Sequence, residues 1–188
     1  MSIRRPDPRG QTRDQPGEAD PLASAVWIRP SHAGDASAVR DLVFGVLAEY
    51  GLKPDHAATD SDLADIEIHY RARGGEFWVV EDGRGRIVGT CGLWMDPDSP
   101  ARAELRKMYL LPETRGRGLG RRLLDTALNH ARRAGVARME LETASTMTAA
   151  IGLYQSAGFV ELDAVPDAPR CDRKFGIDLP YSRPRESP

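Results

Sequence analysis

The sequence predicts an α/β fold, of the α+β kind, in which a mixed sheet carries helices on its faces. Apolar residues repeat with a helical period of about 3.6 in some segments and form short strand-like runs in others. A glycine-rich stretch at residues 115–120 joins one such strand to a clearly amphipathic helix. The expected order is a strand, two helices, three strands, a helix, a strand, a helix and two strands, and 188 residues are enough for one core.

The first half of the chain supplies two of the expected helices and four of the strands. A strand over residues 26–28 ends before Pro30, and Asp35 can cap the helix that follows, which Gly51 ends. The core-facing positions of this helix are Val39, Leu42, Val43, Val46 and Leu47. The later elements are a helix over about residues 61–71, strands over 77–80, 87–95 and 103–111, and a hairpin turn at 82–85.

The second half begins with the amphipathic helix after Gly118, which Gly135 ends. Its apolar face consists of Leu119, Leu123, Leu124, Ala127, Leu128 and Ala131. The remaining elements are a strand over residues 138–143, a helix that places Ala150, Leu153, Tyr154 and Ala157 on one face before Gly158, and strands over 159–162 and 173–179.

The two ends of the chain differ in composition from the middle. Residues 1–23 combine four prolines with Arg, Asp, Gln and Gly, a composition that buries little apolar surface. We therefore expect a disordered arm over residues 1–23, one folded domain over 24–179 and a short tail over 180–188.

Composition excludes several classes of function. The net charge of -2 gives no general attraction to nucleic acid, and no apolar run approaches the roughly 20 residues needed to span a membrane. Cys91 and Cys171 have neither metal-ligand spacing nor a disulfide framework, and the four histidines are scattered. The sequence thus predicts two buried thiols and a cytoplasmic protein without a metal, a nucleic-acid partner or a membrane, with a homodimer as the default assembly.

The glycine-rich stretch predicts a pyrophosphate site. Glycines 116, 118 and 120 let the backbone approach a ligand closely, and the helix start adds unpaired N–H groups. Four arginines, Arg115, Arg117, Arg121 and Arg122, surround the same turn. A P-loop needs Lys and then Ser or Thr after its last glycine, whereas Arg121 and Arg122 follow Gly120 here. The Gly-x-Gly-x-Gly spacing also departs from the dinucleotide-binding fingerprint, in which Glu140 or Glu142 would bind the ribose.

Three motifs together resemble the GNAT superfamily of N-acetyltransferases. They are Arg115-x-x-Gly118-x-Gly120, Leu153-Tyr154-x-x-x-Gly158-Phe159, and Ile28-Arg29-Pro30 followed by Asp35. The resemblance covers about residues 26–179 and includes the order of elements. It implies a mixed, mostly antiparallel sheet of about seven strands, with helices on both faces and a splay at the strands that bind acetyl-CoA.

The resemblance also implies which residues hold acetyl-CoA. The pyrophosphate would bind to the loop formed by Arg115, Gly116, Arg117, Gly118, Leu119 and Gly120. The pantetheine arm would pair with the backbone of Met108, Tyr109 and Leu110. A strand end without a partner independently offers free N–H and C=O groups to such an amide-containing ligand. Whether Arg121 or Arg122 reaches the phosphates stays open.

Two residues are candidates for the chemistry, because an amine must lose a proton and the departing thiolate gains from a proton donor. Tyr154 resembles the family tyrosine that serves as general acid; otherwise it is a packed helix aromatic. Glu104 resembles the strand glutamate that acts as base in histone-type members; otherwise it is paired with Arg106, two residues along the same face. One departure is Met147, which stands where many members carry a cofactor-contacting asparagine.

The segment between the first two helices is the expected acceptor site. His56 lies in it, either as a site residue or as a solvated loop histidine. Asp55, Asp60 and Asp62 make the segment acidic, which would suit a cationic amine.

The resulting hypothesis is an N-acetyltransferase that moves the acetyl group of acetyl-CoA to a primary amine of an undetermined small-molecule or peptide acceptor. The alternative is a non-catalytic acyl-CoA-binding regulatory domain, and a third is an NAD-type binding domain.

Overall fold

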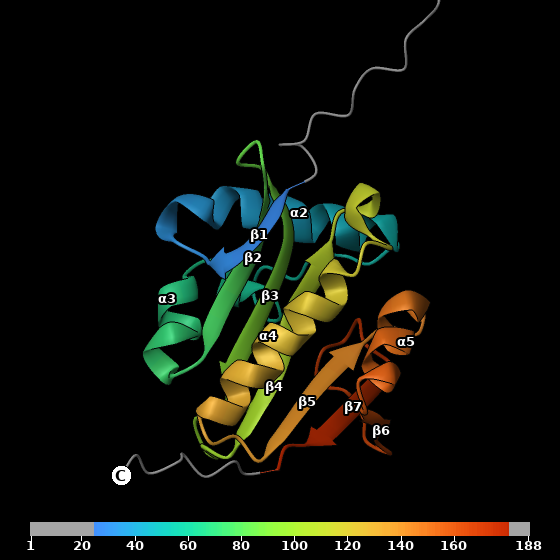
Figure 1. Ribbon diagram of the computed structural model, residues 1–188. Helices are drawn as coiled ribbons and strands as arrows, with labels where there is room; N and C mark the ends of the chain where they lie inside the picture. The colour runs from blue at the N-terminus through green and yellow to red at the C-terminus, as the bar shows by residue number, and fades with distance from the viewer. Residues whose placement is uncertain (1–24, 181–188) are drawn as a thin grey trace, which may run out of the picture.

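The computed structural model describes residues 25–180, and its seven strands form one sheet with helices on both faces (Figure 1). The expected arm over residues 1–23 and the tail beyond residue 180 lie outside the described residues. The strands are β1 (Val26–Pro30), β2 (Glu76–Asp82), β3 (Ile87–Met95), β4 (Arg102–Leu110), β5 (Arg138–Thr143), β6 (Val160–Glu161) and β7 (Arg173–Asp178). Their order across the sheet is β1-β2-β3-β4-β5-β7-β6.

The sheet is mixed and mostly antiparallel, as expected. β4 and β5 form its parallel pair, and the other neighbouring strands run antiparallel. The connection between β4 and β5 contains α4 (Leu119–Arg133), which is the helical crossover that a parallel pair requires. The predicted order of strands and helices is therefore confirmed.

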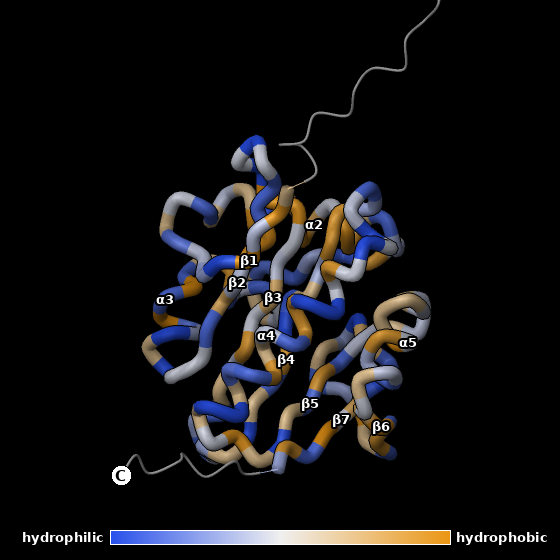
Figure 2. Tube along the Cα trace, in the orientation of Figure 1, coloured by the Kyte–Doolittle hydropathy of each residue, from blue (hydrophilic) through white to orange (hydrophobic). Residues whose placement is uncertain are grey.

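Two hydrophobic cores lie on opposite faces of the sheet. Side chains alternate along β2, so that Trp78 and Val80 belong to the core under α4, while Phe77 and Val79 belong to the core under α2 (Ala36–Glu49). All five apolar positions expected for α2 and all six expected for α4 are buried. Figure 2 shows hydrophilic residues gathered at the turn between β2 and β3, where Gly85 takes a positive φ of 77°.

The strands β4 and β5 separate halfway along their length. Their pairing runs from Arg102 opposite Arg138 to Leu105 opposite Leu141, and residues 106–110 of β4 have no partner on that side. The register between β3 and β4 shifts at the same place, and Lys107 has a φ of 51°. Such a bulge bends a strand and interrupts its pairing, so it opens the sheet on the β5 side.

Two elements hold the bulge in place. The Thr90 hydroxyl on β3 donates a hydrogen bond of 2.7 Å to the Lys107 carbonyl. The Lys107 ammonium reaches the other way and donates to the Thr59 carbonyl at 2.6 Å, in the loop after α2. A positive φ costs energy for a residue with a side chain, and these contacts offset it.

The prediction of a single helix over about residues 61–71 is wrong. The chain forms a 3-10 turn at Ser61–Leu63, a short α3 at Ile66–His69 and another 3-10 turn at Arg71–Arg73. Asp65 is extended, with a φ of -146°, and its side chain accepts the Ile68 N–H. This local hydrogen bond competes with a continuous helix, so a new helix begins at Ile66.

Three smaller expectations also need correction. Asp35 stands at the start of α2 but makes no capping hydrogen bond to it, because its carboxylate accepts from His32 N–H and Arg29 instead. The strand expected over residues 159–162 shortens to β6. Cys91 is fully buried, whereas Cys171 is only partly buried, in the loop before β7.

The described part of the chain contains the helices α2 to α5, and none of the helices in residues 25–180 is long and apolar enough to cross a membrane.

We predict that Thr90→Val lowers the free energy of unfolding by about 1–3 kcal/mol, because it removes a buried donor from the bulge without changing the side-chain volume greatly. The matched control is Thr126→Val, whose exposed hydroxyl bonds within α4 and which should cost about 0.5 kcal/mol or less. Urea denaturation measures both, and equal losses would contradict the role given to Thr90.

Candidate active site

Two cavities meet in the split between β4 and β5. One has a volume of about 280 Å³ and lies against the loop before α4 and the start of α5 (Thr148–Ser156). The other, of about 310 Å³, lies between β4, the loop after α2 and the loop before β7. The residues that line both cavities are Met108, Tyr109, Met147 and Tyr154. A ligand that enters through the first cavity thus reaches the second at these four side chains.

The loop at residues 115–120 lines the first cavity and offers donors to it. Gly118 is the N-cap of α4 with a φ of 75°, a conformation that L residues rarely adopt. Gly120 sits so close to α5 that an added Cβ would lie 3.2 Å from the Leu153 side chain. At the start of a helix the first N–H groups have no carbonyl partner in the preceding turn, so they remain available to an anion.

Two of the four arginines at this turn, Arg115 and Arg121, line the cavity, and Arg117 and Arg122 do not. Arg115 turns its guanidinium to Glu49, with bonds of 2.5 and 2.8 Å, and donates its Nε–H to the Leu110 carbonyl at 3.0 Å. Its side chain therefore braces the loop against α2 and the end of β4. Arg121 lines the cavity and is paired with Asp125 at 2.9 Å, whereas the exposed Arg122 is not part of the lining.

The unpaired stretch of β4 forms the wall that both cavities share. Tyr109 and Leu110 pair with Thr90 and Gly89 of β3 on one side, and their other side faces the split. The predicted residues Met108, Tyr109 and Leu110 all line the first cavity, beside the loop glycines Gly116, Gly118 and Gly120. The structure thus brings the two predicted cofactor-binding segments onto one cavity.

Tyr154 lies at the junction of the two cavities and is 6% exposed. α5 positions it, and its ring lies 6.0 Å from that of Phe159. Burial raises the pKa of the Tyr154 hydroxyl above its ordinary value. The phenol therefore stays protonated at neutral pH, as a proton donor must.

Glu104 and Arg106 extend from β4 into the second cavity. Arg106 donates from Nη2 to Glu104 Oε2 at 2.5 Å, so the pairing considered from sequence is present. The Arg106 guanidinium also lies 4.1 Å above the Trp94 ring. Burial opposes the charge on Arg106, but the bond to Glu104 and the nearby negative charges, that of Glu104 foremost, together outweigh burial and raise the Arg106 pKa.

In the acidic loop after α2, Asp60 and Asp62 are paired with cations and present no free negative charge, which corrects part of the expectation drawn from Asp55, Asp60 and Asp62. Asp60 is buried, accepts two bonds from Arg170 at 2.6 and 2.7 Å, and lies 3.2 Å from Lys107 Nζ. Burial alone would raise the Asp60 pKa, but Arg170, the Asp55 N–H and Lys107 outweigh it and lower it.

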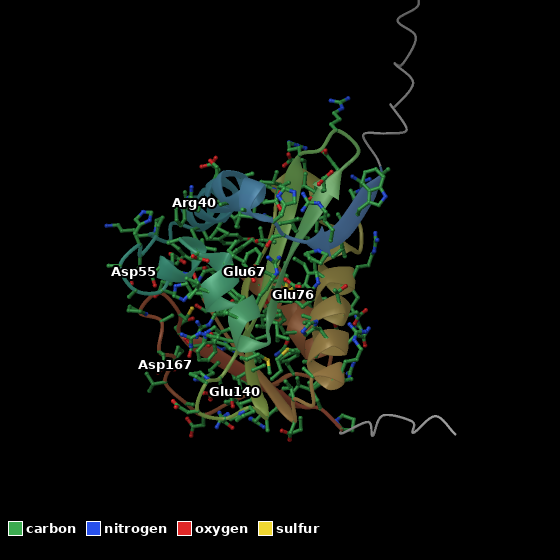
Figure 3. The ribbon with its side chains drawn as sticks, turned by 90° about the vertical axis from the view of Figure 1, so that its left-hand side faces the viewer. Arg40, Asp55, Glu67, Glu76, Glu140 and Asp167 are labelled. Carbon is green, nitrogen blue, oxygen red and sulfur yellow. The ribbon has the colours of Figure 1, made fainter. Side chains whose placement is uncertain are left out.

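Of the other two acids, Asp55 is hydrogen-bonded within the loop and Asp62 has its partners outside it. The Asp55 carboxylate accepts the Ala58 N–H at 3.1 Å. Asp62 accepts the Tyr70 hydroxyl at 2.5 Å, and its second oxygen lies 3.2 Å from Lys107 Nζ. Figure 3 shows Asp55 and Asp167 on loops at the same side of the molecule, away from α4, and the bonds between Arg170 and Asp60 tie these two loops together.

His56 is the solvated loop histidine of its two alternatives, since it is exposed, and the sequence pointed to neither His69 nor Lys107. His56 packs edge-on against Phe44 at 4.7 Å, whereas His69 lines the second cavity. Lys107 follows Ala103 and Leu105 at the alternating buried positions of β4. A charged residue at such a position could have identified Lys107 as a buried, paired lysine from the sequence.

Met147 replaces the asparagine expected from the family and lines both cavities, so an apolar thioether stands at the junction. The Thr143 hydroxyl lies 3.8 Å from the Met147 sulfur, and Ser145 is held by Asp172 at 2.6 Å. Met147 is also the N-cap of α5, so Thr143, Ser145 and Thr146 do not occupy the capping position.

Within residues 25–180, no group of three or more His, Cys, Asp or Glu side chains is placed to hold a metal ion.

The donor loop at a helix start and the unpaired edge of β4 lie on one cavity, which suits a ligand that carries both a pyrophosphate and amides. The model of the acetyltransferase (GNAT) family matches residues 44–159. The chain therefore belongs to the GNAT family of acetyltransferases, and the predicted assignment as an N-acetyltransferase is confirmed.

Relatives and solved structures agree with this family. An uncharacterised N-acetyltransferase of Escherichia coli K12, YjgM, is 38% identical over 132 residues, which cover 69% of this chain and 78% of YjgM. A GNAT-family acetyltransferase of Staphylococcus aureus Mu50 has a TM-score of 0.75 at 24% identity, with coverage of 82% of this chain and 99% of its own. The acetyltransferase yncA of Salmonella typhimurium, solved with acetyl-CoA, has a TM-score of 0.67 at 23% identity, with coverage of 85% and 97%.

We predict that Asp60→Asn lowers the free energy of unfolding at pH 7 by about 3–5 kcal/mol, because it leaves Arg170 and Lys107 short of a buried counter-charge. The Asp60 pKa is lowered in the folded state, so its contribution is present above the unfolded value of about 4 and is lost as the pH falls through the folded value. The difference between the variant and the wild type should therefore shrink in acid.

Urea denaturation at pH 7 and in acid measures this difference. The control is Asp163→Asn, an exposed acid in the loop between β6 and β7, which should change stability little at either pH. A pH-independent difference for Asp60→Asn would contradict the ionic explanation.

Proposed function

We propose that the chain transfers the acetyl group of acetyl-CoA to a primary amine of a small-molecule or peptide acceptor, in the split between β4 and β5. The observation that carries this proposal is the position of Tyr154, which lines both cavities at the point where they meet. The first cavity would hold the cofactor and the second the acceptor.

The residues of the first cavity fit acetyl-CoA. The N–H groups of the loop at residues 115–120 would hold the pyrophosphate, since a helix start favours negative charge. The backbone of Met108, Tyr109 and Leu110 would pair with the amides of the pantetheine arm, as a neighbouring strand would. The apolar side chains of Leu153 and Ala150 complete the wall on the α5 side.

The residues of the second cavity would move the protons. The acceptor nitrogen attacks with a lone pair, so Glu104, directly or through water, takes a proton from it. The new bond joins nitrogen to the acetyl carbon, and the bond from that carbon to sulfur breaks. Tyr154 donates its hydroxyl proton to the departing sulfur, and the same burial that raises the tyrosine pKa also favours protonation of the thiolate.

The direct test is acetyl-CoA-dependent thiol release, measured over small amines, amino acids, polyamines, aminoglycosides and peptides. Binding of acetyl-CoA without thiol release from any of them would support the regulatory-domain alternative.

We also propose a cytoplasmic location, because both cysteines are free, as is usual in a reducing compartment. The homodimer stays a prediction.

We predict that Tyr154→Phe lowers kcat by about 10²- to 10⁴-fold, because the variant cannot donate a proton to the sulfur. Acetyl-CoA affinity should stay nearly unchanged, since the ring and its packing remain. The control is Tyr50→Phe, a tyrosine that lines the first cavity away from the junction and should keep its turnover. A large loss of affinity at unchanged kcat would speak against the acid role.

We predict that Glu104→Gln reduces kcat/KM at pH 7 by a factor of about 10² or more and that the deficit narrows as the pH rises toward the acceptor's pKa, because the amine then loses its proton without a base. The control is Glu140→Gln, which lies opposite Glu104 on β5 and is paired with Arg138 outside the cavity. A deficit that stays constant with pH would exclude the base role.

A further inference from the structure

The second cavity contains one arginine whose hydrogen-bonding capacity is largely unused. Beside His69, three positively charged side chains line it: Arg106, Lys107 and Arg170. The Lys107 ammonium donates to the Thr59 carbonyl at 2.6 Å and lies 3.2 Å from the carboxylates of both Asp60 and Asp62. Arg170 is held by Asp60 through two bonds. Arg106 has five N–H donors and, within residues 25–180, gives one hydrogen bond, to Glu104.

The acids of the cavity, in contrast, are already satisfied by this chain. Glu142 accepts the N–H groups of Asp167 and Ala168 at 2.9 Å each, and it lies 3.1 Å from Lys174 Nζ. Lys174 Nζ also lies 3.4 Å from Asp167. Asp62 and Glu104 have the partners described above. Each of these carboxylates therefore has a hydrogen-bond donor or a cation among the described residues, which weakens its attraction for an acceptor with several positive charges.

Arg106 is built to hold an anion in one orientation. Its guanidinium rests on the Trp94 ring at 4.1 Å, which fixes the plane of the donor fork. Its side chain is 29% exposed, so part of the fork faces the cavity rather than the core. A planar fork with free N–H groups matches a carboxylate, which accepts two parallel hydrogen bonds.

We propose that the acceptor is an amine that also carries a carboxylate, an α-amino acid or a close analogue, and that Arg106 binds this carboxylate. The proposal rests on the proposed function and names the substrate class of the same site. Glu104 and Arg106 are in contact, and in an α-amino acid one carbon separates the amine from the carboxylate. Such a molecule bridges the pair, with its ammonium at Glu104 and its carboxylate at Arg106.

This arrangement also resolves the difficulty that Glu104 is paired before the acceptor arrives. The acceptor carboxylate takes the place of Glu104 at the Arg106 fork, and Glu104 turns to the ammonium. The ammonium proton then passes to Glu104, and the nitrogen gains the lone pair that forms the bond to the acetyl carbon. An amine without a carboxylate does not displace Glu104 from Arg106, so Glu104 stays paired and does not turn to the ammonium.

The test compares each common amino acid with its α-carboxamide in the thiol-release assay, using the full-length protein. The amide keeps the side chain and removes the negative charge. It also lowers the pKa of the α-amine, so each pair is compared over a range of pH. We expect at least one amino acid to exceed its amide in kcat/KM by about 10- to 100-fold, the size of a charge-assisted hydrogen bond. Arg106→Gln should raise the amino acid's KM and reduce this preference to near one, and Arg106→Lys should keep an intermediate preference.

The matched control is Arg102→Gln, on the same strand, where Arg102 is paired with Glu140 outside the cavity and the preference should persist. Protection of each variant by acetyl-CoA against thermal unfolding shows that it folds and binds. If Arg106→Gln does not fold, the wild-type panel and Arg106→Lys still decide. Equal activity on acids and amides, or an equal loss on both in Arg106→Gln, would overturn the inference and leave the proposed function standing. No thiol release with any amine would overturn both.

Discussion

The separation of β4 from β5 after Leu105 is the constraint on which the rest of the site depends. A buried strand edge without a partner is costly, because its N–H and C=O groups lose hydrogen bonds to water. The bulge at Lys107 keeps the edge open, with Thr90 on one side and the loop after α2 on the other. A ligand with its own amides can fill the gap and supply the missing hydrogen bonds. The unpaired edge of β4 therefore favours ligands that carry amide groups.

The same bulge lies between the two cavities. Lys107 belongs to the unpaired stretch of β4, whose later residues line the first cavity, and its ammonium lies 3.2 Å from Asp60 and from Asp62 beside the second. Arg170 then ties Asp60 to the loop before β7 across 110 positions of sequence. The shape of the second cavity therefore depends on buried ion pairs, and removing one partner of such a pair is strongly destabilising.

Local pattern was enough to predict most of the fold. The spacing of Leu119 to Ala131 identified α4, and the glycines at 116–120 identified the donor loop, because periodicity and backbone freedom are properties of neighbouring residues. The failures involve competition or distance. Asp65 interrupts the expected second helix through a side-chain bond, and the acids at 60 and 62 meet bases from β4 and the loop before β7, which no local pattern reveals.

Hydrogen exchange with and without CoA tests most directly whether the split in the sheet is the cofactor site. We predict that CoA protects the amides of Met108, Tyr109 and Leu110 together with those of Gly118 to Gly120, and leaves exchange in the paired strands β6 and β7 unchanged. Protection confined to another face of the sheet, with residues 108–110 exchanging as fast as in the free protein, would contradict it.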